Sequence, residues 1–255
     1  VLGRPRGSPL LCPLLLAFAV YQVRPTLAVL MPVGLQLRDL PPKIGDLVGE
    51  VCHLRAKIGE ARGKCAKIGD LSELVGEATH GRGLLDLAGG PGTYAVLLAQ
   101  AHPALQCVTV DLPAVSAVAA ELVAAAGMTE HVTCRAGDYH TDLYEEAAFD
   151  AVTIFGALHQ EAPEMIVSIL TRACAALRPG GRLFVLDMMT DATRTQPVFS
   201  ALFALNMALT TDHGWVFSDA ELHTWLQQAG FEACTTQHVP PPMPHWLVTA
   251  RKPVH

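Results

Sequence analysis

The sequence has few charged residues and few aromatic ones. Charged residues make up 16% of its 255 residues and aromatic residues 6%, against 51% hydrophobic residues. Disordered chains show the opposite balance, so this composition indicates a globular protein with a large core. Acidic residues outnumber basic ones by 24 to 18. That net negative charge argues against nucleic acid as the main partner, because phosphate binding requires a basic surface.

Cysteines at metal-binding or redox spacing are absent. The chain has seven cysteines, with no C-x-x-C pair and no cysteine–histidine cluster of zinc spacing. We therefore predict no metal site. An odd and unpatterned set of cysteines fits reduced thiols in a cytoplasmic protein.

A long hydrophobic run is also absent. The apolar run at residues 9–20 contains Pro9 and Pro13 and is too short for a transmembrane helix, so we expect no membrane span. Because Arg4 and Arg6 precede it, the run could belong to a secretory signal that ends near residues 26–28. The alternative is a buried pair of helices, interrupted at Arg24 and Pro25.

Residues 1–80 differ from the rest of the chain. The motif Lys-Ile-Gly-acid recurs at residues 43–46, 57–60 and 67–70, and apolar residues between 44 and 75 fall near helical spacing. Each glycine weakens such a helix by about 1 kcal/mol. We expect an atypical, mainly helical N-terminal region that is either a partner-binding or dimer segment or a solvated connector. Residues 81–255 would form the second domain.

From residue 83 onward, segments typical of strands and of helices alternate. This alternation predicts an α/β fold, with a largely parallel sheet covered by helices on both faces. The expected strands are residues 84–87, 106–110, 132–135, 149–155, 182–186, 233–238 and 246–250. The expected helices are residues 94–100, 114–126, 163–177, 197–210 and 219–229, the last with a capping box formed by Ser218 and Glu221.

A glycine-rich turn joins the first of these strands to the next helix. Asp86 stands near the end of the strand, and Gly89, Gly90 and Gly92 follow it. Glycines allow a sharp turn and a close approach to a ligand, and the helix N-terminus offers free N–H groups. Asp111 ends the next apolar run, where an acid can accept hydrogen bonds from a ribose diol. The pattern predicts a nucleoside-containing cofactor, although Asp111 could instead cap the helix that starts near Pro113.

Five short motifs occur in a recognisable order: Leu-Asp-Leu-Ala-Gly-Gly-Pro-Gly at 85–92, Asp-Leu-Pro at 111–113, Gly-Asp-Tyr at 137–139, Ala-Leu-His at 157–159 and Leu-Arg-Pro-Gly-Gly at 177–181. From about residue 83 to residue 252 the chain resembles the S-adenosylmethionine-dependent small-molecule O-methyltransferases of plants and bacteria, a group that includes acetylserotonin and caffeic-acid methyltransferases. The resemblance implies a class I methyltransferase fold, a Rossmann-like sheet of seven strands with the last antiparallel.

The resemblance also implies a cofactor site for S-adenosylmethionine. Gly90 and Gly92 would approach its methionine part, Asp111 would hold the ribose hydroxyls, Asp138 would bond the adenine amino group, and Tyr139 would pack on the adenine ring. Asp138 could instead only cap a turn. The full set of implied cofactor residues is Asp86, Gly89, Gly90, Gly92, Asp111, Leu112, Asp138 and Tyr139.

Catalytic and acceptor-binding residues follow from the same resemblance. His159 matches the general base that takes the proton of the acceptor hydroxyl, and Asp187 stands where the family has a carboxylate that orients this histidine. Asn206 and Met207, with Phe203 on the same helix, match residues that line the acceptor pocket, although a pure packing role is equally open for them.

The chain departs from the family pattern at several positions. Ala88 replaces the first glycine of the turn. The methyl group of an alanine can be tolerated at this position if its φ angle is negative. Gln160 and Glu161 replace an Asp-Trp pair, and Trp215 begins a segment that lacks a second orienting glutamate.

We expect methyl transfer to a hydroxyl of an aromatic or polyketide-like small molecule. The alternatives are a relative that methylates carbon or nitrogen or supports a hydroxylation, a degenerate non-catalytic domain, and a nicotinamide-dependent reductase. The reductase is disfavoured because the turn lacks the full G-x-G-x-x-G spacing.

Overall fold

The computed structural model describes residues 67–79, 83–211, 213–239 and 245–254. The described residues all belong to one compact unit, whose first residue is Ala56. The apolar run at 9–20 and the repeats at 43–46 and 57–60 lie outside the described residues. The third repeat forms the start of helix α3 (Lys67–Thr79). The division into domains at residue 80 stays a prediction.

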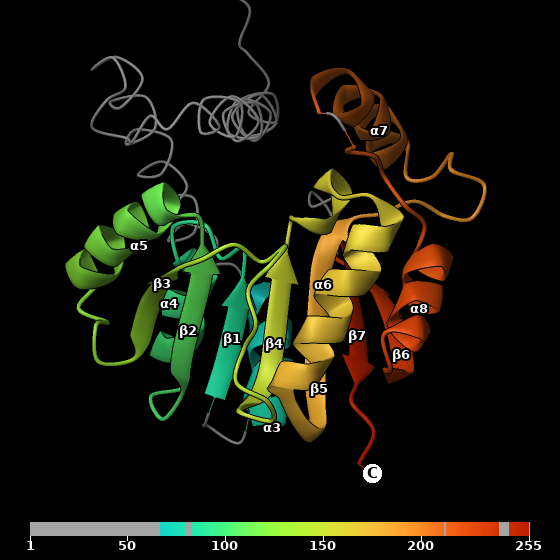
Figure 1. Cartoon of the computed structure of the whole chain (residues 1–255). Helices are drawn as coiled ribbons and strands as arrows, with labels where there is room; N and C mark the ends of the chain where they lie inside the picture. Colours follow the sequence, from blue (N-terminus) through green and yellow to red (C-terminus); the bar gives the residue numbers. More distant parts are fainter. Residues whose placement is uncertain (1–66, 80–82, 212, 240–244, 255) are drawn as a thin grey trace, which may run out of the picture. The chain divides into compact units, whose positions relative to one another are not determined.

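The described residues form a seven-stranded sheet with the order β3-β2-β1-β4-β5-β7-β6 (Figure 1). The strands are β1 (Gly83–Leu87), β2 (Gln106–Asp111), β3 (Val132–Ala136), β4 (Phe149–Phe155), β5 (Leu177–Met188), β6 (Glu232–His238) and β7 (His245–Arg251). Neighbouring strands from β3 to β5 pair in parallel, whereas β7 runs antiparallel to both β5 and β6. This order, with the last strand antiparallel, confirms the predicted class I methyltransferase fold.

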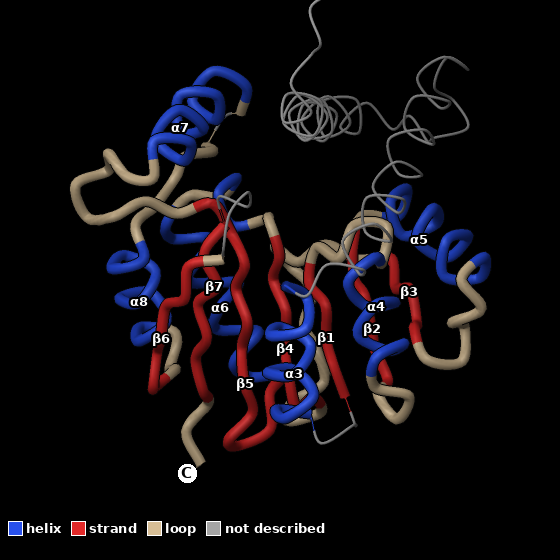
Figure 2. Tube along the Cα trace, turned by 180° about the vertical axis from the view of Figure 1, so that it is seen from behind, coloured by secondary structure: helices blue, strands red, loops and turns tan. Residues whose placement is uncertain are grey.

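Helices cover both faces of the sheet. Three helices follow parallel strands: α4 (Thr93–Ala101) follows β1, α5 (Pro113–Ala125) follows β2 and α6 (Pro163–Ala176) follows β4. Helix α8 (Asp219–Gln228) lies between β5 and β6 in the sequence. Seen from behind, α3 and α4 lie in front of the strands, whereas α6 lies beyond them (Figure 2). Among the helices that the structure describes, none combines the length and the apolar character needed to cross a bilayer.

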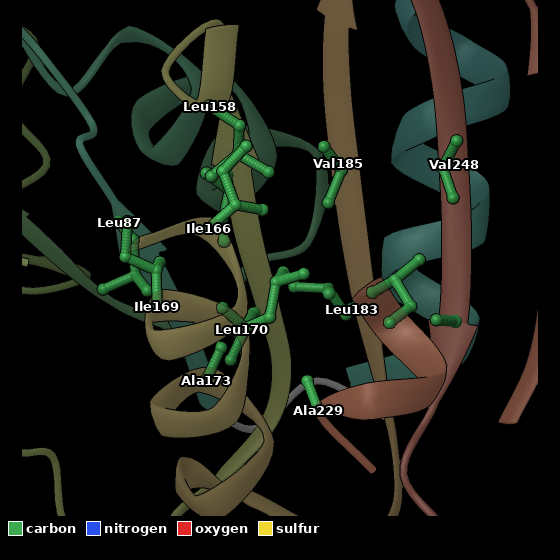
Figure 3. Packing of buried hydrophobic residues seen from close by; sticks show 14 of the residues in the cluster. Leu87, Leu158, Ile166, Ile169, Leu170, Ala173, Leu183, Val185, Ala229 and Val248 are labelled. Carbon is green, nitrogen blue, oxygen red and sulfur yellow. The ribbon is translucent and has the colours of Figure 1, made fainter. Parts of the chain in front are cut away.

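Two buried clusters hold these layers together. On one face, Ile166, Ile169 and Leu170 of α6 pack against Leu183 and Val185 of β5 (Figure 3). On the other face, Val75 of α3 and Leu98 of α4 pack with Leu84, Cys107 and Phe184. Adjacent strand residues point to opposite faces, so apolar residues on both faces produce the unbroken hydrophobic runs seen in the sequence.

Most element boundaries lie within one residue of those predicted, and the capping box of Ser218 and Glu221 is present at the start of α8. The fifth strand is the main exception, because β5 begins at Leu177 and not at residue 182. Leu177 pairs with Phe149, and the register then shifts before Ala151 pairs with Arg182. The Leu-Arg-Pro-Gly-Gly motif therefore belongs to the strand, with Gly180 at φ +79° supplying the irregular turn.

The last long helix of interest is α7 (Val198–Thr210). It lies beyond the edge of the sheet toward which the arrowheads of β2 and β4 point (Figure 1). Ligands of parallel sheets bind at this carboxyl edge. The same edge carries the turn after β1 and the short helix η3 (Leu158–Gln160) that contains His159.

Candidate active site at the carboxyl edge of the sheet

The turn after β1 has a left-handed backbone at three positions. Ala88, Gly90 and Gly92 have φ values of +53°, +57° and +73°. The condition under which a methyl group at this position would be tolerated, a negative φ, is therefore not met. A left-handed conformation costs an L-residue about 1–2 kcal/mol. The buried Ala88 is thus a strained residue inside the proposed cofactor turn.

Asp86 lies inside β1, one residue before its end, and is 1% exposed. Its carboxylate accepts hydrogen bonds from Thr153 at 2.7 Å and from Thr109 at 3.5 Å. Burial raises the pKa of Asp86 to about 7, and the nearby Asp111 adds to this, while the two threonine hydrogen bonds oppose it. The side chains of Asp86, Thr109 and Thr153 lie on the same face of the sheet, because side chains alternate between the two faces along each strand and these three residues occupy equivalent positions.

Asp111 is the last residue of β2 and its side chain is bound to the turn. Oδ2 accepts a hydrogen bond from the Gly90 N–H and Oδ1 accepts one from the Leu112 N–H, both at 2.8 Å. Leu112, and not Asp111, is the N-cap residue of α5. The carboxylate thus lies directly beside the glycine-rich turn, as a nucleoside-binding acid requires.

At Gly89 the turn leaves no room for a side chain. A Cβ at this position would overlap Thr109 Oγ1 and would approach the Asp86 carboxylate. The backbone therefore runs directly over two polar groups and leads into the N-terminus of α4. A carboxylate acceptor, a bare turn and helix N–H donors are the groups that the ribose and the amino-acid part of S-adenosylmethionine would need, so the residues present fit this cofactor.

The segment after β3 contains Asp138, Tyr139 and His140. Asp138 Oδ1 accepts a hydrogen bond from the His140 N–H at 2.9 Å and lies 3.1 Å from His140 Nδ1. Tyr139 donates its hydroxyl to Glu161 Oε1 at 2.6 Å, and the Tyr139 carbonyl accepts from Arg172 at 2.6 Å. Asp138 thus caps this turn, and its side chain keeps 44% exposure to solvent. Its contact with the adenine amino group stays a prediction.

His159 and Asp187 form a buried pair. His159 Nδ1 lies 2.7 Å from Asp187 Oδ1, and both side chains are 0% exposed. The backbone N–H groups of Met188 and His159 also donate to this carboxylate, at 2.7 and 3.3 Å. Because a carboxylate only accepts, Nδ1 carries the proton, which leaves Nε2 as the nitrogen that can take one.

The predicted acceptor residues lie on α7, on the side of the site where His159 is found. The Phe203 ring packs edge-to-face on the His159 ring, with 5.4 Å between centroids. Phe203 and Met207 are buried one helical turn apart, and Asn206 is half-buried beside them. The structure brings Phe203 to the histidine, whereas the contribution of Asn206 and Met207 to acceptor binding stays a prediction.

Sequence reasoning missed several polar residues of this edge. Thr109 and Thr153 interrupt apolar strands on the face that carries Asp86, and this pattern was visible in the sequence. His140, Glu161 and Arg172 gave no such signal, because their contacts join three separate segments of the chain.

Comparison with known proteins identifies the family of this chain. Residues 77–232 match the family described as the O-methyltransferase domain, and the chain belongs to this family.

Three relatives show the range of that family. The chain is 33% identical to 3-hydroxy-5-methyl-1-naphthoate 3-O-methyltransferase of Streptomyces sahachiroi, over 67% of this chain and 49% of the relative. It is 31% identical to L-tyrosine C(3)-methyltransferase of Streptomyces lavendulae, over 66% and 47%. The methyltransferase PigF of a Serratia species, solved with SAH, is 27% identical with a TM-score of 0.62, over 67% of this chain and 50% of that one. The chain therefore spans about half the length of the curated relatives it matches.

Proposed function

We propose that this chain transfers a methyl group from S-adenosylmethionine to a hydroxyl of an aromatic or polyketide-like small molecule, with His159 as the general base. The observation that carries the proposal is the buried His159–Asp187 pair at the carboxyl edge of the sheet. A base of this kind contributes about 10²–10⁴-fold to the rate.

Different residues of the chain would bind the cofactor, take the proton and control the approach of the acceptor. The turn at 88–92 and Asp111 would hold the cofactor, which supplies the electrophilic methyl group when bound. Asp187 fixes the tautomer of His159, so that Nε2 can accept the proton of the acceptor hydroxyl. Since His159 is fully buried and packs on Phe203, α7 would control the approach of the acceptor. Positioning of this kind supplies up to about 7–11 kcal/mol of the barrier.

The experiment is a methyl-transfer assay on a panel of phenols and hydroxylated polyketides, with methyl-labelled S-adenosylmethionine and the full chain. Labelled product from the wild type, and a loss of at least about 100-fold for His159→Ala, would support the proposal. His223→Ala is the matched control, because His223 contacts Thr236 on β6 and stands outside the site. Equal turnover by His159→Ala and the wild type would show that His159 does not act as a general base.

A second candidate is methyl transfer to carbon or nitrogen. It is favoured by the likeness to a tyrosine C(3)-methyltransferase and by Glu161, which stands where the resemblance has a tryptophan. The position of the label in the product, read by NMR, decides between the two. A degenerate domain, with residues 1–80 acting as a dimer or partner segment, would instead show neither product nor cofactor binding, and sedimentation of the full chain would report the dimer.

A further inference from the structure

One carboxylate at the site joins segments that are distant in the sequence. Glu161 follows η3 by one residue, and its side chain is 12% exposed. Oε1 accepts the Tyr139 hydroxyl at 2.6 Å, and Oε2 lies 2.8 Å from His140 Nε2. Both oxygens are therefore bound to residues that follow β3, where the adenine end of the cofactor is expected.

The backbone of Glu161 is tied to the segment that carries His159. The Glu161 carbonyl accepts the indole N–H of Trp215 at 3.1 Å, and the Trp215 N–H donates to the His159 carbonyl at 2.8 Å. The Glu161 N–H donates to the Leu158 carbonyl at 3.0 Å. Glu161 is thus the link between residues 138–140 and the catalytic histidine.

His140 makes this link sensitive to charge. Its two ring nitrogens face the carboxylates of Glu161 and Asp138, at 2.8 and 3.1 Å. The Tyr139 ring lies 4.6 Å away between centroids, and the charge of Arg172 on α6 opposes a positive His140. The hydrogen bond to Glu161 raises the pKa of His140, although burial alone would lower it. Burial alone would raise the pKa of Glu161, but the hydrogen bonds from His140 and Tyr139 lower it.

We propose that Glu161 is a positioning residue, whose carboxylate clamps residues 138–140 to the segment of His159 and so fixes the adenine end of the cofactor site relative to the base. The functional role of this clamp rests on the proposed function, whereas the contacts that form the clamp do not depend on it. It is tightest when His140 is protonated, and it loosens as the pH rises through the raised pKa of His140.

Glu161→Gln tests the clamp, because it keeps the size of the side chain and removes its charge. Glu164→Gln is the matched control, since Glu164 is exposed three residues away in the first turn of α6. In the ligand-free full chain we expect Glu161→Gln to lower the NMR-measured pKa of His140 and to speed amide hydrogen exchange at residues 138–142. Glu164→Gln should change neither. Affinity for S-adenosylhomocysteine should fall by about tenfold in Glu161→Gln, the effect of losing one charge-assisted hydrogen bond, and most clearly below the pKa of His140.

An unchanged His140 pKa and unchanged exchange rates in Glu161→Gln would overturn the proposal. If Glu161→Gln does not fold, Tyr139→Phe removes only the hydroxyl donor to Oε1, and faster exchange at residues 159–161 is then the expected result. Unchanged exchange in that variant would also overturn the clamp. If the wild type binds no S-adenosylhomocysteine, the proposed function fails, while the two ligand-free measurements still decide the clamp.

Discussion

His159 and Asp187 lie 2.7 Å apart in a fully buried pair that joins η3 to the carboxyl end of β5. The Met188 N–H also donates to the same carboxylate oxygen that faces His159. This arrangement holds the aspartate in place independently of the histidine. The pair therefore has two properties that the proposed role of His159 as a base requires: a fixed carboxylate and a fixed tautomer.

Asp187→Asn should reduce methyl transfer by at least about 100-fold, because an amide nitrogen can face Nδ1 and favour the wrong tautomer. Binding of S-adenosylhomocysteine should persist, since the hydrogen bonds of the Asp187 carboxylate go to His159 and to the Met188 N–H and not to the turn at 88–92. Parallel measurements of turnover and of cofactor affinity check this. A variant with wild-type turnover would show that the carboxylate has no role in orienting His159.

Ala88→Gly should be more stable than Ala157→Gly by about 1–2 kcal/mol in chemical unfolding. Both changes remove a buried methyl group and loosen the unfolded chain. Only the first also relieves a left-handed backbone, because φ is +53° at Ala88 and −127° at Ala157. Equal losses of stability in the two variants would contradict the strain assigned to Ala88.

Gly89→Ala should lower the free energy of unfolding by about 1–3 kcal/mol or more, because the new Cβ would overlap Thr109 Oγ1 beneath the turn. It should also abolish binding of S-adenosylhomocysteine. Gly83→Ala at the start of β1 is the control, because a Cβ there meets only ordinary contacts at 3.5 Å or more. A Gly89→Ala variant as stable as this control would refute the close approach.

The stability of the protein should fall between about pH 4 and pH 7 because of Asp86. Burial raises its pKa from 3.8 to about 7, so in this range the folded state holds a proton that the unfolded state has lost. At about 1.36 kcal/mol per pKa unit, the loss is on the order of 2–4 kcal/mol. Asp86→Asn should flatten the curve when unfolding is measured at pH 5 and pH 8, and identical curves for both proteins would count against a neutral buried Asp86.

The architecture was accessible from the sequence because its signals are local. Apolar runs that end in an acid, glycine turns and helix caps each predict an element or its boundary. The sequence also places Asp86, Asp111 and His159 at one edge, because parallel strands end together. The contact between His159 and Asp187 was expected from the family resemblance, and the structure shows it directly.

The remaining features depend on the third dimension. No local pattern shows that Ala88 adopts a φ of +53°, because an L-residue other than glycine rarely takes this conformation. The role of Glu161 was equally hidden, since its partners Tyr139 and Trp215 lie 22 and 54 positions away in the chain. Such polar networks form where several segments meet, and pattern analysis of single segments does not detect them.

A calorimetric titration of the full chain with S-adenosylhomocysteine would test the cofactor site directly. The turn at 88–92, with Asp111 bound to the Gly90 N–H, predicts one-to-one binding in the micromolar range. Such binding would establish the nucleoside site on which the proposed methyl transfer depends. A folded sample that gives no binding heat over a range of temperatures, and no change in thermal stability with ligand, would contradict the cofactor site and with it the proposed function.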